Sequence, residues 1–503
     1  MDVDNNKHGR EGQDTGDATG DASHKKIKLG DLEKELRDWT LFELFDGLTK
    51  LSAQEDEDDL LEIVREIRKR LAGPSGLHIL LSDQVKPFLT GGLTAALPAV
   101  RELTLAQLAR TASAGPQGFA LLTEVWPAIV KSVADSNLRV ATIAVQTILT
   151  VAKEAVGQEL VFSSTSSSMF NGMIIESEVL RLRVLDLFVE LSLQSAELLE
   201  RSKDYLGLMS RELDSKDLLQ RMNVLELLEK LAKTEHGVAY VQSSGAMASI
   251  LHLLTDTEDP GFSLLCGSAL RLLASIARQQ GIGGDLQSFV PVLKVVEQLL
   301  ESRDESCAEA AISFVGALGS TVAGAELLLS RRALVKSWFE HLTATAMLLR
   351  LSCLHALAEL LTCPDHEKTL EIFNVEDKGW DGSSSGEVMR TFMKFLDQPF
   401  PDLRHATFHA VQALARHPWG VKALFAYPGF LEFIVNRGTE TTKEGKEWKY
   451  AIVESIVMGE KQYDNRARET LGEAAFNQLV TYLTEGVHYV QGELATKIAS
   501  KSA

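Results

Sequence analysis

Four arginines occupy the same position of a recurring helical pattern, and their guanidinium groups could bind acidic groups in either of two directions. Each lies eleven residues before the residue that closes its helix, and the four are Arg181, Arg221, Arg350 and Arg404. Facing outward, they would form a basic ladder for acidic groups of a partner. Facing inward, each would bond carboxylates or helix-end carbonyls of its own or the next repeat. Asp217 and Asp402, which closely precede Arg221 and Arg404, favour the inward arrangement.

A protein partner would be contacted through exposed residues on the second helices of the central repeats. The candidate partner-binding residues there are Arg139, Arg181, Arg183 and Arg221. For Arg181 and Arg221 the outward and the inward interpretations both stay open, since the sequence does not say which way these side chains point.

Other residues that could do chemistry do not assemble into a site. His405 and His409 share one helix face, which suits a metal ion, but Ala406 stands where zinc hydrolases need a glutamate. The serine-rich run 163–168 could accept phosphate groups, although it is more typical of a loop between repeats. No nucleophile and base can be grouped from their spacing, so we expect no enzyme activity, no metal and no cofactor.

The elements that carry these residues repeat along the chain. Helical apolar stretches end in a small closing pair, and successive pairs lie 40 to 45 residues apart, except for a last step of 54. The pairs are Leu108-Ala109, Val151-Ala152, Leu191-Ser192, Leu231-Ala232, Ile276-Ala277, Leu318-Gly319, Leu360-Leu361 and Leu414-Ala415. This period predicts an all-α fold, a HEAT/armadillo-like α-solenoid superhelix, whose usual task is to bind another protein. We call the helix before each pair a closing helix.

The repeat pattern also predicts how the chain is divided. Composition and turn signals separate terminal tails, helical caps that cover the two ends of the stack, and the array itself. The expected segments are a disordered acidic tail at 1–30, an N-terminal helical cap at 31–97, repeats at 98–437 with a flexible insertion near 376–387, a C-terminal helical cap at 438–490 and a frayed tail at 491–503.

Charge and composition exclude several classes of partner. The 503 residues carry a formal net charge of −19, which repels nucleic acid and anionic membranes, so we expect neither as a partner.

The sequence also predicts where the protein is located. The four cysteines show no CxxC spacing, which is typical of packing in a reducing compartment. We find no signal peptide and no apolar run long enough to span a membrane. We therefore expect a cytoplasmic location; the short basic patch at 25–28 adds the nucleus as a second compartment.

One C-terminal stretch contains specific short sequence motifs in addition to the repeat pattern. These are Gln398-Pro399-Phe400-Pro401, His417-Pro418-Trp419-Gly420, Pro428-Gly429-Phe430 and, later, Tyr482-Leu483-Thr484-Glu485-Gly486 with Tyr489-Val490. In these motifs the chain resembles the non-ATPase regulatory subunit 5 family of the 26S proteasome. The members of that family are HEAT/armadillo-like assembly chaperones. The turn Lys233-Thr234-Glu235-His236-Gly237 is also similar. The tail before Gly30 and the Gly/Ser insertion near 380 depart from the family pattern.

The resemblance implies a specific function. A member of this family would be a non-catalytic chaperone that binds the C-terminal domain of one proteasome base ATPase subunit. It would dissociate before the regulatory particle is complete, and we expect it to be a monomer when free. The resemblance does not identify which ATPase subunit is bound or which face binds it.

Two other classes of function compete with this interpretation. A general armadillo-type adaptor for transport or trafficking would bind extended peptides in a groove with a tryptophan at one repeated position. The six tryptophans of this chain share no repeat position, which makes the adaptor the weaker alternative. An enzyme on a helical scaffold would need converging titratable groups, and the sequence offers none.

Overall fold

The computed structural model describes residue 36 and residues 39–51, 57–280, 289–376 and 386–488. Throughout these residues the chain forms helices and turns and no strand, which confirms the predicted all-α fold of helical repeats. The chain packs as two compact units, the first up to Phe170 and the second from Asn171 onward. The two predicted tails and most of the insertion near 376–387 lie outside the described residues, and the division into caps and array stays a prediction.

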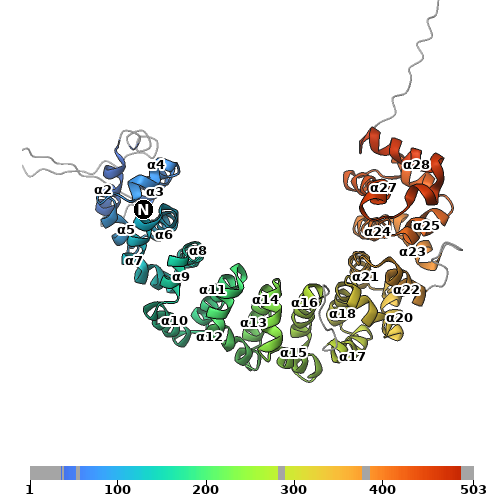
Figure 1. Cartoon of the computed structure of the whole chain (residues 1–503), viewed down its shortest axis with the longest axis horizontal. Helices are drawn as coiled ribbons and strands as arrows, with labels where there is room; N and C mark the ends of the chain where they lie inside the picture. The colour runs from blue at the N-terminus through green and yellow to red at the C-terminus, as the bar shows by residue number, and fades with distance from the viewer. Residues whose placement is uncertain (1–35, 37–38, 52–56, 281–288, 377–385, 489–503) are drawn as a thin grey trace, which may run out of the picture. The chain divides into compact units, whose positions relative to one another are not determined.

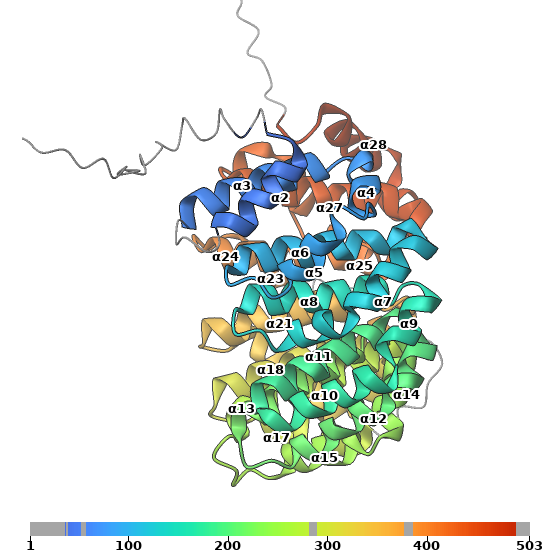
Figure 2. The ribbon, with the colours of Figure 1, turned by 90° about the vertical axis from the view of Figure 1, so that its left-hand side faces the viewer.

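In the first unit, four helices of 7 to 15 residues precede the first closing helix. Phe88 of α5 packs against Phe42 and Phe45 of α2, with ring centroids 5.8 and 5.2 Å apart. Helices α3, α6 and α8 follow one another through direct contacts (Figure 2). The bounds are α2 (Leu41–Leu51), α3 (Glu57–Leu71), α4 (Pro74–Leu80), α5 (Lys86–Gly92), α6 (Pro98–Thr111), α7 (Pro116–Lys131), α8 (Leu138–Val151) and α9 (Ala155–Val161); α10 (Ser164–Glu176) spans the boundary between the units.

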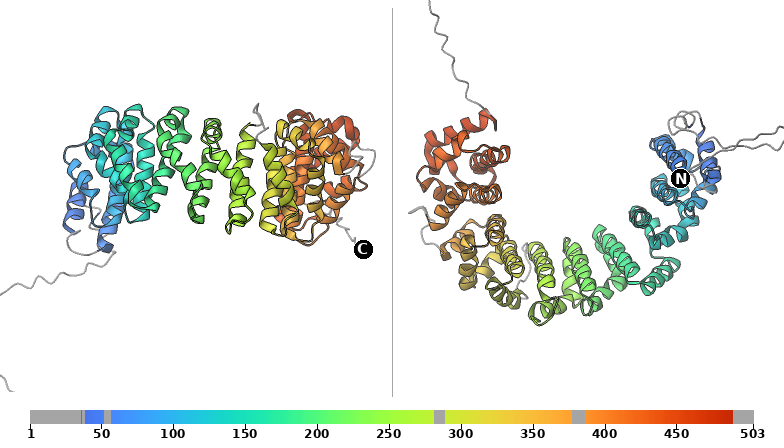
Figure 3. Two further views of the ribbon diagram at one scale, coloured as in Figure 1. Left: turned by 90° about the horizontal axis from the view of Figure 1, so that it is seen from below. Right: turned by 180° about the vertical axis from the view of Figure 1, so that it is seen from behind.

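In the second unit the closing helices α11, α13, α16, α18, α21 and α24 contact one another in chain order, and α24 contacts α27 (Figures 1 and 3). Their bounds are α11 (Glu178–Gln194), α13 (Leu218–Leu231), α16 (Phe262–Gln280), α18 (Glu305–Gly319), α21 (Met347–Leu360), α24 (Pro401–Leu414) and α27 (Lys443–Gln462). Between them lie α12 (Ala196–Leu213), α14 (Glu235–Ser243), α15 (Ala246–Thr255), α17 (Val290–Leu300), α19 (Val322–Leu329), α20 (Arg332–Glu340), α22 (His366–Glu376), α23 (Glu387–Leu396), α25 (Pro418–Ala426) and α26 (Phe430–Val435), with α28 (Ala467–Glu485) last.

Many of the predicted closing pairs mark real helix ends. Ala152, Ala232, Leu361 and Ala415 are the residues that cap α8, α13, α21 and α24. The pair at Leu108-Ala109 was placed too early, because α6 continues to Thr111 and is capped by Ala112. Arg110 and Thr111 still belong to α6, so the regular spacing of 40 residues starts from its cap, Ala112.

A glycine follows most closing helices and lets the next helix approach closely. A Cβ atom on any of these glycines would lie 1.8 to 2.1 Å from a carbonyl oxygen at the C-terminal end of the closing helix, that of its last or last but one residue. No side chain fits at such a distance, so the tight turn between the helices requires glycine. The five positions are Gly118, Gly157, Gly237, Gly324 and Gly420.

The carbonyl groups at the ends of closing helices are bound by side chains from the following repeat. The Nε2 atom of His236 lies 2.8 Å from the carbonyl oxygen of Ser192, and Asn465 donates to that of Ala415 at 3.0 Å. The same contact joins Nε2 of His417 to the carbonyl oxygen of Leu361 at 2.8 Å. These carbonyls have no partner inside their own helix, so the contacts satisfy them and join neighbouring repeats.

One local expectation was wrong. The serine run 163–168 is not a loop: α10 begins at Ser164, and Trp126 donates a hydrogen bond to the buried Ser166 at 2.8 Å.

The four cysteines are buried and unpaired, in line with a packing role.

Within the described segments, no single helix is both long and apolar enough to cross a membrane. The pair α18 and α19, bent by 119°, meets that test jointly by length and composition.

We predict that Gly237→Ala destabilises the protein, because its Cβ would lie 1.8 Å from the backbone oxygen of Leu231. The overpacking should cost about 1–3 kcal/mol and lower the midpoint of guanidinium unfolding followed by circular dichroism. Gly207→Ala is the matched control, because that exposed helical glycine has nothing within 4 Å of the new methyl group. It should leave the midpoint unchanged or raise it. Equal midpoints for the two variants would contradict the close approach.

Candidate partner-binding surface

Arginines at the fourth position of closing helices pair with acids of the following repeat. The acid lies 31 to 38 residues after each arginine. It stands at the end of the intervening helices or in the loop before the next closing helix, so each ion pair bridges two repeats. The pairs are Arg101–Asp135, Arg181–Glu212, Arg221–Asp259 and Arg404–Glu440.

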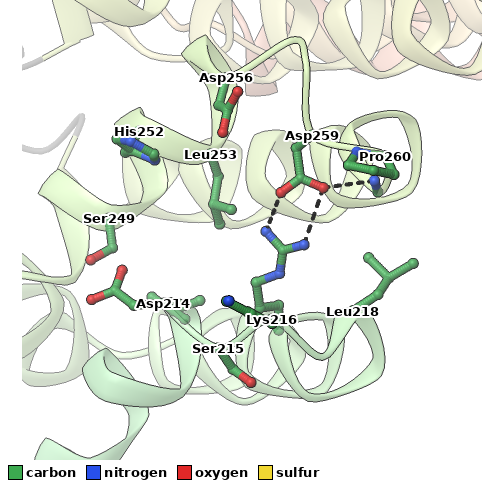
Figure 4. A pocket seen from close by; sticks show the side chains of 13 residues that line it. Asp214, Ser215, Lys216, Leu218, Ser249, His252, Leu253, Asp256, Asp259 and Pro260 are labelled. Atoms are coloured by element: carbon green, nitrogen blue, oxygen red, sulfur yellow. Dashed lines mark hydrogen bonds and ion pairs between the residues drawn. The ribbon is translucent and has the colours of Figure 1, made fainter.

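Arg221 shows the arrangement most completely; its partner Asp259 is labelled in Figure 4. Its side chain is 10% exposed, and its two terminal nitrogens lie 2.5 and 3.2 Å from the carboxylate oxygens of Asp259. This hydrogen-bonded pairing, together with the backbone N–H of Gly261, lowers the pKa of Asp259 below its usual value. Asp217 is not the partner that the sequence suggested: it caps α13 by accepting from the backbone N–H groups of Leu219 and Gln220.

The other arginines of the predicted ladder also face inward. Arg181 bonds Glu212 at 2.9 Å and the carbonyl oxygen of Ile174 at 3.2 Å. Arg404 bonds Glu440 and the carbonyl oxygen of Leu396, while Asp402 is exposed and is not its partner. Arg350 reaches only the carbonyl oxygen of Thr345, at 3.4 Å. The inward interpretation of the sequence is therefore the arrangement that the structure has.

The four candidate partner-binding arginines lie in different surroundings. Arg181 and Arg221 are occupied by the inter-repeat pairs described above. The side chain of Arg139 is 80% exposed and only 3.5 Å from a carboxylate oxygen of Glu102. Arg183 is half-buried on α11. Contact with a partner stays a prediction for all four, and Arg139 has the guanidinium that is most accessible to one.

Sequence reasoning missed Arg101, which makes the same pair as the others. Its Nε and Nη2 atoms lie 2.8 and 3.0 Å from the two oxygens of Asp135. Counting back eleven residues from Ala112, the true cap of α6, leads to Arg101. The signal was present, but the misplaced closing pair concealed it.

The paired histidines do not form a metal site. His409 is half-buried, with its ring centroid 5.9 Å from that of His355 and 5.5 Å from that of Trp448. Burial is the main cause that lowers the pKa of His409. Among the residues that the structure describes, no group of three or more histidine, cysteine or acidic side chains could hold a metal ion.

Comparison with known proteins identifies the family of this chain. The family model described as "Proteasome non-ATPase 26S subunit" matches residues 21–503. The chain belongs to this family. It is 26% identical over 482 residues to the 26S proteasome non-ATPase regulatory subunit 5 of Homo sapiens, covering 94% of this chain and 93% of the relative. The Drosophila melanogaster protein of the same name is 27% identical over 335 residues, covering 64% and 63% of the two chains.

Solved structures with a similar arrangement are helical repeat proteins. Kap121p is 11% identical and aligns with a TM-score of 0.49, covering 92% of this chain and 55% of its own. A designed armadillo repeat protein in complex with a (KR)4 peptide is 15% identical and aligns with a TM-score of 0.38. The alignment covers 50% of the chain described here and 99% of the designed protein.

We predict that Arg221→Ala is strongly destabilising, because it leaves the carboxylate of Asp259 without its partner between two repeats. The expected loss is about 1.5–3 kcal/mol, the range for hydrogen bonds to charged groups, measured as the shift in the guanidinium unfolding midpoint. Lys203→Ala serves as control, since Lys203 pairs with Glu200 on an exposed helix face and should change the midpoint little. An Arg221→Ala midpoint as close to wild type as the control would contradict a structural role for the ladder.

Proposed function

We propose that this protein is a non-catalytic chaperone for assembly of the regulatory-particle base of the 26S proteasome. In this proposal it binds the C-terminal domain of an ATPase subunit of the base and leaves before the complex is mature. The observation that carries the proposal is the family match over residues 21–503, together with the non-ATPase subunit 5 relative aligned over 93% of its length.

The physical properties of the chain support a binding role rather than catalysis. Helical repeats expose a long surface and bury only the contacts between neighbours, so they suit recognition of another folded protein. The net charge of −19 favours a basic or apolar protein partner over nucleic acid. We propose that the chain is a monomer when free and acts in the cytoplasm, with the nucleus as a second compartment.

A general armadillo-type adaptor is less well supported. Such a groove would need tryptophans on an exposed helix face, at one repeated position. In the described repeats Trp126, Trp338 and Trp419 are buried in the core instead, where the ring nitrogen of Trp338 donates to the carbonyl oxygen of Ile312. A buried indole cannot contact an extended peptide, so this chain has no such tryptophan ladder at these three positions.

The proposal is tested by recovering the tagged full-length protein from cells at low abundance and identifying the bound proteins by mass spectrometry. We expect enrichment of ATPase subunits of the base without subunits of the 20S core, because a chaperone would be absent from the mature particle. Recovery of transport receptors with no ATPase subunit above background would contradict the proposal. Co-recovery of the complete 26S particle in stoichiometric amounts would instead indicate a permanent subunit.

A further inference from the structure

An apolar cavity of about 320 Å³ lies in the first unit, between α2, α5 and α6, which are labelled in Figure 2. Its walls are aromatic and aliphatic side chains from all three helices: Phe45, Leu48, Phe88, Leu89, Val100 and Leu103. None of the residues that line it carries a charge. The cavity therefore favours an uncharged and largely apolar occupant.

One buried side chain of the lining has a free hydrogen-bond donor. Gln107 on α6 is 5% exposed, and its Oε1 oxygen accepts a hydrogen bond from Nη1 of Arg110 at 2.8 Å. Arginine can only donate, so this contact fixes which end of the amide is the oxygen. The Nε2 nitrogen is then the end left for the cavity, and it has no hydrogen-bond partner among the described residues. It is not among the side-chain atoms that the fold both seals from solvent and leaves unpaired, so an acceptor in the cavity can reach it.

The other polar side chain of the lining is already engaged. The hydroxyl of Thr104 donates to the carbonyl oxygen of Val100 at 2.8 Å. Helix α5 also approaches Thr104 closely at Gly92, where a Cβ atom would lie 2.2 Å from that hydroxyl oxygen. Among the lining side chains the free donor is thus the amide of Gln107, which suits a carbonyl oxygen. A peptide segment carries one such acceptor on every residue.

The apolar surface continues beyond the cavity. Phe42 on α2 is 51% exposed, and its ring meets that of Phe88 edge to face, with centroids 5.8 Å apart. Gly91 of the lining is exposed and has open space around its Cβ position, so the cavity is open to solvent at α5. A small molecule confined to the cavity would leave Phe42 uncovered, whereas a protein segment that lies across the opening would cover it.

We propose that this cavity binds an uncharged segment of a partner protein, anchored by one or two large apolar side chains. The anchor side chains fill the space between Phe45, Phe88 and Leu103. A backbone carbonyl of the same segment accepts from Nε2 of Gln107, and neighbouring apolar atoms of the segment cover Phe42. The site defines the chemistry of the bound segment whichever protein supplies it, and so goes beyond the proposed function.

Other occupants fit the cavity less well. A charged segment or a nucleic acid would bring its charges to a lining that has none to pair with them. A metal ion would find no charged or histidine ligand in this lining. The volume lies at the lower end of the range for small-molecule sites, about 300–1,000 Å³, which suits anchoring side chains better than a ligand that buries most of its own surface.

The test is a subtractive selection from a random twelve-residue peptide library displayed on phage, with the full-length protein as target. The library is first depleted on Gly91→Leu, whose added side chain enters open space at the lining, and is then selected on wild type. We expect the recovered peptides to carry large apolar residues without charged neighbours. In fluorescence anisotropy they should bind Gly91→Leu at least about tenfold more weakly than wild type, the effect of losing one buried aliphatic anchor.

A second variant tests the amide donor. Gln107→Glu replaces the donor by an oxygen and keeps the acceptor for Arg110, so it should weaken binding of the selected peptides about threefold to tenfold. The matched controls are Gly207→Leu, at an exposed helical glycine with nothing within 4 Å of its Cβ position, and Gln146→Glu, at an exposed helical glutamine. Neither residue lines the cavity, and both controls should bind the peptides as wild type does.

Recovery of no peptide after depletion would overturn the site, as would equal binding by wild type and Gly91→Leu. Selected peptides that depend on charged residues would also contradict it. Sedimentation of the full-length protein tests a second copy as the occupant: a dimer that Gly91→Leu dissociates would overturn the assignment to a different protein. Unfolding midpoints of all variants exclude misfolding as the cause of weaker binding.

Discussion

The packing of the repeats depends on how the carbonyl groups at the C-terminal ends of the closing helices are bound. The last carbonyl groups of an α-helix have no partner within it, and here the chain turns back tightly over them. Glycines such as Gly237 and Gly324 admit the next helix to within contact of those carbonyls. Side chains of the following repeat, including His236 and His417, then bind the carbonyl groups that still lack a partner. One short turn thus sets both the packing inside a repeat and the contact to the next.

The opposite ends of the closing helices are joined by charge instead. Arg101, Arg181, Arg221 and Arg404 each reach an acid in the following repeat, so the guanidinium groups that could have formed a basic surface are used within the fold. The internal pairing of the arginines therefore commits these four guanidinium groups to contacts between repeats.

The fold could be predicted from the sequence because its period is carried by local signals. Closing pairs such as Val151-Ala152 and Leu231-Ala232 mark helix ends directly. The direction of the arginines could not be predicted, because the acid that binds Arg221 lies 38 residues later and its approach depends on how two repeats pack.

The most direct measurement is a cryo-EM structure of the protein with a bound partner. We expect the Arg181–Glu212 and Arg221–Asp259 pairs to be intact inside the fold. A complex in which these arginines leave their acids to contact the partner would contradict the conclusion that the ladder joins repeats.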